Sequence, residues 1–232
     1  MLELNNIYAG YGESNILQNV SITVPAGTLT TVLGSNGVGK TTMLKAIMGL
    51  LPINSGEVHW EGQPLDKAVW ARSQSGIGYV PQGREIFPFL SVHENLVLGL
   101  EAMGYRSEAI KRAADSAYER FPILKPFRRR RGGNLSGGQQ QILAIARVII
   151  CNPKLLVLDE PSEGIQPSIV RQISDTLETL KTEGTSILLV EQYPDFALAH
   201  ADFYYLMTHG CMSESGTVTE QNRADIQSRI EI

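Results

Sequence analysis

The chain has 232 residues, of which 43% are hydrophobic and 19% charged, as is typical of a globular protein with one large core. Its formal net charge of −4 argues against binding through a general basic surface, so we expect no nucleic-acid partner. No apolar run approaches the roughly 18 residues that a membrane span needs, and we expect no signal peptide. The two distant cysteines and four scattered histidines fit no metal-ligand spacing, so we expect free thiols and no histidine metal site.

Residues 2–33 alternate short apolar runs with turn residues, which predicts a series of β-strands. Turns are expected at 10–12 and 25–27, and the last strand at 29–33. Strands at such close spacing favour an antiparallel sheet laid against the core that the following segments form. Tyr11 lies between two glycines, and two interpretations are equally open. It is either a surface residue of the turn or an aromatic plate on which adenine stacks.

The segment 34–41 has the form G-x-x-x-x-G-K-[ST] and is called the phosphate loop below. It follows an apolar strand and precedes a helical pattern at 42–50, which is the context in which this motif binds phosphate. Its three glycines let backbone N–H groups surround an anion, and the helix N-terminus adds partial positive charge. We expect Lys40 to reach the β- and γ-phosphates and Thr41 to offer its hydroxyl to Mg²⁺. The predicted nucleotide contacts of this region are Gly34, Ser35, Asn36, Gly37, Val38, Gly39, Lys40, Thr41 and Thr42.

The middle of the chain changes from strands to helices. A hairpin is expected at 55–62, a helix at 68–75, and a strand at 77–80 directly before Gln82. From about residue 91 the pattern is helical, and Ser91 with Glu94 forms a capping box that opens the first helix of this region. Another helix is expected at 108–121.

Four consecutive arginines, 128–131, precede the next helix. Such a run favours a solvated, mobile stretch over a binding role for phosphate or a partner surface.

The segment Leu135-Ser136-Gly137-Gly138-Gln139, called the signature segment below, opens that helix. Ser136 and Gln139 fit a capping box. Capping does not explain two glycines in the first turn, each of which costs about 1 kcal/mol relative to alanine. Glycine permits the close approach of another group, and an anion at this second helix N-terminus is a physical possibility.

Residues 155–158 form a continuous apolar run, typical of a strand buried on both faces. Asp159 and Glu160 follow at its carboxyl end, where open α/β sheets place their ligands. Two adjacent carboxylates are costly there unless they serve a cation or a water. We therefore expect Asp159 to hold Mg²⁺ and Glu160 to orient and deprotonate a water. A helix at 169–180, a buried strand at 187–190, strands at 202–218 and a short polar helix complete the chain.

Together, the order and spacing of these motifs resemble the ATP-binding subunits of ABC transporters over essentially the whole chain. Residues 34–41 look like Walker A, residues 155–160 look like Walker B, and the signature segment matches the family signature as it stands. The resemblance implies an α/β fold with a parallel-sheet, RecA-like P-loop NTPase core and an antiparallel β subdomain, at 1–82 and 153–232. A helical subdomain with the signature is expected to be inserted at 83–152.

The resemblance also implies roles by position. Tyr11 is similar to the residue that stacks on adenine, and Gln82 corresponds to the Q-loop glutamine, which senses Mg²⁺ and faces the membrane subunit. Ser136 and Gly138 of the signature segment would contact the γ-phosphate of an ATP held by the opposite protomer. The implied catalytic residues are Glu160, Gln192 and Lys40; the implied Mg²⁺ residues are Thr41, Gln82 and Asp159; and the signature contributes Ser136, Gly137, Gly138 and Gln139 to ATP binding.

Two positions depart from the wider family. Gln192 replaces the switch histidine, and Gln166 replaces the D-loop aspartate. A glutamine amide can donate a hydrogen bond to a phosphate oxygen but carries no titrating proton, so catalysis is assigned mainly to Glu160. Val190-Glu191-Gln192 resembles the branched-chain amino-acid transporter ATPases. Within that group, residues 83–88, 163–167 and 191–193 look most like the urea-uptake branch.

The resemblance implies an ATPase subunit that energises an ABC importer for urea, with branched-chain amino acids or another amide as the alternative substrate. Implied partners are a second, unlike ATPase subunit (or a second copy), two transmembrane permease subunits and, indirectly, an external substrate-binding protein. The implied place is the cytoplasmic face of the inner (plasma) membrane. A non-transport ABC ATPase and a regulatory nucleotide-binding module without turnover are the alternatives from other classes, and Glu160 speaks against the second.

Overall fold

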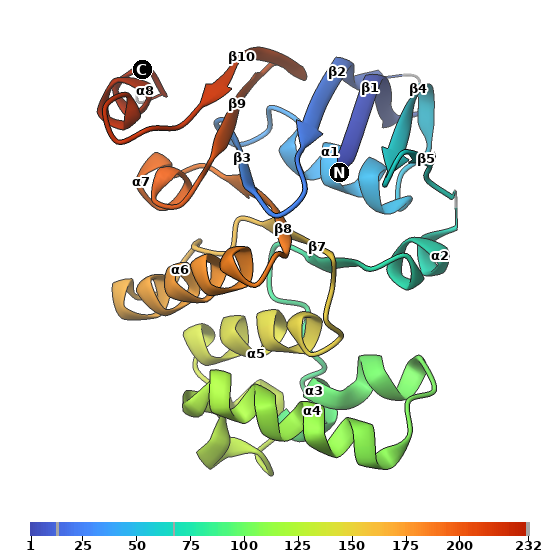
Figure 1. Ribbon diagram of the computed structural model, residues 1–232, viewed down its shortest axis with the longest axis vertical. Helices are drawn as coiled ribbons and strands as arrows, with labels where there is room; N and C mark the ends of the chain where they lie inside the picture. The colour runs from blue at the N-terminus through green and yellow to red at the C-terminus, as the bar shows by residue number, and fades with distance from the viewer. Residues whose placement is uncertain (13, 67, 231–232) are drawn as a thin grey trace.

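In the computed structural model, which describes residues 1–12, 14–66 and 68–230, the strands form two sheets (Figure 1). The smaller sheet is antiparallel and has the order β2-β1-β4-β5. The expected antiparallel subdomain is therefore present. Its strands are β1 (Leu2–Tyr11), β2 (Ser14–Val24), β4 (Ile53–Trp60) and β5 (Gln63–Pro64).

The larger sheet has the order β10-β9-β3-β8-β7-β6, and every pair in it is parallel except β9 with β10. Its central strands β3, β7 and β8 are buried along their whole length, as their apolar runs predict. The predicted parallel core is confirmed. The strands are β3 (Leu29–Leu33), β6 (Ile77–Val80), β7 (Leu155–Asp159), β8 (Ser186–Glu191), β9 (Phe203–Thr208) and β10 (Cys211–Thr217).

The first hairpin closes later than expected. Tyr11 is the last residue of β1 and pairs with Ser14, while Gly10 pairs with Asn15. The turn predicted at 10–12 is therefore wrong for its first two residues. A Cβ at Gly10 would lie 1.8 Å from the Ser14 carbonyl oxygen, so the glycine serves close strand pairing rather than a turn. Residue 13 lies outside the described residues.

Three helices, α3, α4 and α5, gather at one end of the molecule, where α5 also packs against β6 of the larger sheet (Figure 1). The capping boxes predicted at Ser91 and Ser136 are both confirmed, at the starts of α3 and α5. The helices are α1 (Lys40–Met48), α2 (Val69–Gln74), α3 (Val92–Ala102), α4 (Ser107–Arg120), α5 (Gly137–Ile149), α6 (Pro167–Thr182), α7 (Pro194–Leu198) and α8 (Arg223–Ile230), with 3₁₀ turns at Pro122–Phe127 and Gly132–Asn134.

The hydrophobic core consists of two clusters on opposite faces of the larger sheet. Along β7, Leu156 and Leu158 belong to the cluster shared with the helices α3 to α7, whereas Leu155 and Val157 belong to the cluster shared with α1 and the antiparallel sheet. This alternation follows from the two-residue period of a strand. Side chains pack against both faces of β7. The position of the residues that follow it, at the edge of the sheet, is therefore fixed by packing on two sides.

The arginine run is anchored rather than mobile. The carbonyl oxygens of Arg130 and Arg128 accept hydrogen bonds from the N–H groups of Val92 and His93, at the start of α3. The Arg128 guanidinium lies over the ring of Tyr118, 5.1 Å from its centroid. All four arginine side chains are nevertheless exposed, so solvation is confirmed for the side chains.

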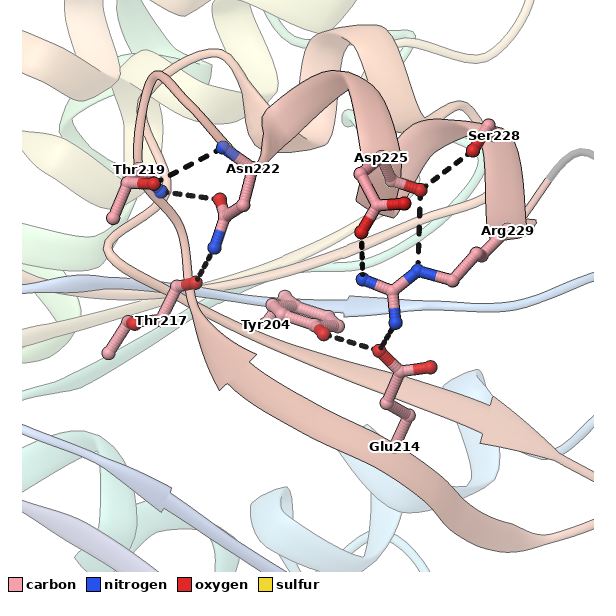
Figure 2. A network of polar contacts seen from close by, with 8 residues as sticks. All are labelled: Tyr204, Glu214, Thr217, Thr219, Asn222, Asp225, Ser228 and Arg229. Carbon is pink, nitrogen blue, oxygen red and sulfur yellow. Dashed lines mark hydrogen bonds and ion pairs between the residues drawn. The ribbon is translucent and has the colours of Figure 1, made fainter.

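The short polar helix predicted at the end of the chain is α8, and Figure 2 shows how it is attached. Arg229 forms ion pairs with Glu214 of β10, at 2.6 Å, and with Asp225 of its own helix, at 2.9 Å. The Tyr204 hydroxyl donates to the same Glu214 carboxylate. Beneath this network, Ile226 is 1% exposed and belongs to the core.

Within the described ranges, no helix is both long and apolar enough to cross a membrane. Cys151 and Cys211 are half-buried free thiols, as their sequence positions predict.

Candidate functional site

The phosphate loop connects β3 to α1, and its glycines occupy positions that only glycine fits. Gly37 has φ 81° and Gly39 has φ 116°, both in the left-handed region. A Cβ at Gly34 would lie 2.5 Å from the Met207 carbonyl oxygen. Helix α1 begins at Lys40, directly after the loop. The loop backbone is thus shaped as a concave turn at a helix N-terminus, which is an arrangement that binds anions.

Lys40 is only 4% exposed and is held by three groups. Its Nζ donates to the carbonyl oxygens of Gly34, at 2.8 Å, and of Ser35, at 3.0 Å. It also lies 3.0 Å from Oε1 of Glu160, whose side chain is equally buried. A buried ammonium is stable only with such partners, and a phosphate oxygen offers the same kind of acceptor.

Asp159 ends β7 beside two hydroxyl groups. Thr41 donates to its Oδ1, at 3.2 Å, and Tyr79 donates to its Oδ2, at 3.3 Å. Burial raises the pKa of Asp159 to about 6; the hydrogen bond from Thr41 lowers it, and the charge of Glu160 raises it further. Mg²⁺ prefers oxygen ligands, and a carboxylate beside a threonine hydroxyl supplies two of them. The carboxylate is costly to ionise because it is buried, and a bound cation would offset that cost. The residues present therefore fit the ion that the sequence predicts.

Glu160 follows Asp159 with φ 46°, a left-handed conformation that is uncommon outside glycine and is often found at functional sites. Its Oε2 accepts a hydrogen bond from Nε2 of Gln82, at 3.0 Å. The same Nε2 donates to Glu163, at 2.8 Å. With Lys40 on Oε1 and Gln82 on Oε2, each oxygen of the expected base has a partner in this conformation.

Lys40, Thr41, Gln82 and Glu160 border one cavity of about 380 Å³, whereas Asp159 and Glu163 are not among its lining residues. It brings together segments that are far apart in the sequence: the end of β1, the phosphate loop with the start of α1, the second residue after β6 and the residue after β7. Tyr11, which is 52% exposed, lies at its border. The lining residues are Tyr11, Ile16, Asn36, Gly37, Gly39, Lys40, Thr41, Thr42, Gln82 and Glu160.

The signature segment does not line this cavity among the residues that the structure describes. Ser136 and Gln139 are occupied with each other at the start of α5. Packing within the chain supplies a reason for the glycines. A Cβ at Gly138 would lie 2.8 Å from Cγ1 of Ile169 in α6, and one at Gly137 would lie 2.8 Å from the Arg84 guanidinium. Contact of this segment with a partner's nucleotide remains a prediction.

Gln192 and Gln166 also lie outside the cavity lining. Gln192 directly follows β8 and is half-buried, and its N–H donates to the Glu191 carboxylate, at 3.2 Å. Gln166 is exposed and precedes α6, whose first turn receives no side-chain cap from it. A phosphate contact of Gln192 stays a prediction.

Sequence reasoning missed three polar residues around the site. Glu191 is 1% exposed; burial raises its pKa, and its Oε1 accepts from the N–H of Ser162 at 3.0 Å. Tyr79 contacts Asp159, and burial raises its pKa before the nearby Asp159 charge adds to the shift. Both lie at or near the carboxyl ends of parallel strands, so the rule that singled out Asp159 points to them as well. Glu163 gave no such signal, because it lies in a turn.

Comparisons with known proteins identify the family of the chain. The sequence profile of the family described as ABC transporter matches residues 17–163. The high-affinity branched-chain amino acid transport ATP-binding protein BraG of Pseudomonas aeruginosa is 38% identical over 216 residues, 90% of each chain. The probable branched-chain amino acid transport ATP-binding protein LivF of Archaeoglobus fulgidus is 36% identical over 222 residues, 95% of this chain and 93% of the relative.

Solved structures give the same result. A nucleotide-free ATP-binding cassette from an ABC transporter superposes with a TM-score of 0.87 at 29% identity, covering 100% of this chain and 98% of that one. A dimeric, post-hydrolysis ATP-binding cassette bound to ADP and Pi superposes with a TM-score of 0.85 at 26% identity, covering 94% of this chain and 99% of that one. By sequence, fold and site geometry, the chain belongs to the ABC transporter family and has the fold of its ATP-binding cassette.

Proposed function

We propose that this chain is the ATP-hydrolysing subunit of an ABC importer. The observation that carries the proposal is the convergence of Lys40, Thr41 and Glu160 on one cavity beside the phosphate loop. An anion-binding loop alone accounts for nucleotide binding. A buried carboxylate within reach of the same cavity adds a group that can activate water, which a regulatory module without turnover does not need.

Substrate binding would rearrange the contacts around Lys40. The β- and γ-phosphate oxygens are stronger acceptors than the Gly34 and Ser35 carbonyls, so Lys40 would move to them and release Glu160. The released carboxylate can accept a proton from a water that attacks the γ-phosphorus in line, with ADP as the leaving group. Lys40 and the loop N–H groups would offset the charge that develops in the transition state.

Thr41 and Asp159, with Gln82, are the residues that fit Mg²⁺, which when bound supplies neutralisation of the phosphate charge. Asp159 contributes best when ionised, and contact with a cation lowers the free-energy cost that burial imposes on that state.

One chain holds half of the proposed site. The signature segment lies apart from the cavity, so we propose that a second ATPase subunit supplies its own signature segment to close the nucleotide in. A dimeric cassette among the structural relatives supports this arrangement. We propose an unlike partner, with a second copy of this chain as the alternative.

An apolar groove supports the proposed contact with the permease subunits. A cavity of about 440 Å³ lies between α2 and β6 on one side and α3 and α5 on the other, and Gln82 is two residues from the end of β6. Trp70, which follows the lining residue Val69, is 68% exposed, and the lining residue Phe87 is 46% exposed. Exposed aromatic residues of this kind mark protein-binding surfaces. The proposed place of the chain is therefore the cytoplasmic face of the inner membrane.

For the imported substrate we propose urea, with branched-chain amino acids or another amide as the alternative. Support for urea comes from the likeness of residues 83–88, 163–167 and 191–193 to the urea-uptake branch. Support for the alternative comes from the two curated relatives named for branched-chain amino acid transport.

The test is phosphate release by the purified chain, alone and with its partner ATPase and permeases in vesicles supplied with urea or leucine. Hydrolysis that needs Mg²⁺ supports the proposal, and stimulation by only one of the two substrates identifies the cargo. Nucleotide binding without phosphate release under every condition would leave a regulatory module instead.

A further inference from the structure

Gln82 is held by two carboxylates at the same end of its side chain. Its Nε2 lies 3.0 Å from Oε2 of Glu160 and 2.8 Å from Oε2 of Glu163. A side-chain amide nitrogen carries two N–H groups, so each can serve one carboxylate. Both neighbours are acceptors when ionised, which fixes the nitrogen at this end of the amide and leaves the oxygen as the end that can act as a metal ligand.

Glu163 is placed by a turn that is itself anchored. The N–H of Glu163 donates to the Glu160 carbonyl oxygen, at 3.3 Å, and the N–H of Ser162 donates to the buried Glu191 carboxylate, at 3.0 Å. The turn begins at the left-handed Glu160 and contains Pro161. Glu160 and Glu163 therefore both contact the side-chain amide of Gln82, although they are 78 and 81 residues away from it in the sequence.

The two carboxylates differ in whether they can keep their hydrogen bond to Gln82 when a substrate binds. Glu160 is buried, pairs with Lys40 and is the proposed base, so its partners change during turnover. Glu163 is exposed, lines no part of the cavity, and has no proposed contact with nucleotide. Of the two anchors on Gln82, Glu163 is therefore the one that can persist while Glu160 acts on water.

We infer that Glu163 is a positioning residue for the metal end of Gln82. It holds the amide nitrogen, which keeps the amide oxygen available to Mg²⁺ while Glu160 exchanges its partners. Partners of a metal ligand that fix its orientation commonly contribute 10- to 100-fold to metal affinity. Because Glu163 is exposed and its hydrogen bond is solvent-accessible, we expect the low end of that range. The inference rests on the proposed function, since it concerns the same nucleotide and metal.

The test measures metal affinity without hydrolysis. Wild type and Glu163→Ala are loaded with a non-hydrolysable ATP analogue, and Mn²⁺ binding is followed by electron paramagnetic resonance. We expect Glu163→Ala to weaken Mn²⁺ binding about 10-fold, with nucleotide affinity in EDTA unchanged. Glu163→Gln keeps an acceptor oxygen and should recover most of the affinity. Glu119→Ala, an exposed glutamate of α4, should match wild type.

A double-mutant cycle with Gln82→Ala identifies the route. If Glu163 acts through Gln82, the double variant should bind Mn²⁺ no more weakly than Gln82→Ala alone. Wild-type Mn²⁺ affinity in Glu163→Ala would overturn the inference, and so would an equal loss in the Gln82→Ala background. A wild-type chain that binds no nucleotide would instead overturn the proposed function, so the two failures are distinguishable. Thermal melts of each variant check that the fold is intact.

Discussion

Lys40 and Glu160 form a buried ion pair, with 3.0 Å between Nζ and Oε1 and side chains only 3% and 6% exposed. The pair joins the proposed phosphate-binding residue to the proposed base. A charge at this depth is costly without its counter-charge, so nucleotide binding has to give each partner a replacement. In the proposed mechanism, Lys40 would gain phosphate oxygens and Glu160 would gain the attacking water.

The first prediction concerns Glu160→Gln. The amide keeps the shape of the side chain but cannot accept the proton from water, so we expect turnover to fall about 10²- to 10⁴-fold. ATP binding should be retained, because Lys40 and the loop N–H groups are unchanged. Phosphate release and binding of a fluorescent nucleotide check the two parts. Unchanged turnover would rule out Glu160 as the base, and Glu119→Gln serves as the exposed control.

The second prediction concerns Tyr11, which borders the cavity at the end of β1. If its ring stacks on adenine, Tyr11→Ala should weaken ATP by about 1–3 kcal/mol and free triphosphate much less. Tyr11→Phe keeps the aromatic face and should bind ATP nearly as wild type. Competition binding with ATP and triphosphate measures the difference, and equal losses for both ligands would exclude stacking.

The third prediction follows from the pKa of Asp159, which burial raises to about 6 from 3.8. The folded state binds this proton more tightly than the unfolded state, so ionisation destabilises the fold as pH rises from about 4 to about 6. Asp159→Asn removes that cost, and we expect it to raise the metal-free unfolding free energy at pH 7 by on the order of 2–3 kcal/mol.

Urea denaturation at several pH values tests this. The gain should nearly vanish near pH 3, where the wild-type carboxyl is mostly protonated in both states. The exposed Asp175→Asn should show no such gain. Magnesium-dependent hydrolysis should be lost in Asp159→Asn even though the protein is more stable, and a variant that is less stable at pH 7 would contradict the prediction.

Most of the candidate site follows from local sequence, because a phosphate loop and a carboxylate after a buried strand are defined by neighbouring residues. Tyr11 could not be decided, since its place depends on where the hairpin between β1 and β2 closes. The contact between Gln82 and Glu163 joins residues 81 positions apart. Residues 128–131 are anchored through backbone carbonyl oxygens. The hydrogen-bond partners of a backbone carbonyl cannot be predicted from the side-chain types in the sequence.

The fourth prediction separates two reasons for Gly138. A methyl group there would lie 2.8 Å from Ile169, so Gly138→Ala should cost about 1–3 kcal/mol in unfolding free energy through overpacking. Adding Ile169→Ala should relieve the clash and recover part of the stability. If the glycine also approaches a partner's nucleotide, ATPase activity of the assembled dimer should stay low in the double variant. Recovery of activity together with stability would show that Gly138 serves packing alone.

The fifth prediction concerns the attachment of α8. Arg229 is surface-exposed, so Arg229→Ala should lower the unfolding free energy only slightly despite its two ion pairs (Figure 2). Ile226 is buried, and Ile226→Ala should cost about 2–4 kcal/mol. Chemical denaturation gives both values. A larger loss for Arg229→Ala than for Ile226→Ala would mean that the polar network, rather than the apolar contact, holds the helix.

Strand β8 lies between β3 and β7 and pairs with both. Leu33 at the end of β3 pairs with Glu191, and Asp159 at the end of β7 pairs with Val190. The width of the site is therefore two strand spacings of about 4.8 Å, fixed by backbone hydrogen bonds rather than by side chains. Because this spacing is set by backbone pairing rather than by side chains, a cassette of only 29% identity can share the fold with a TM-score of 0.87.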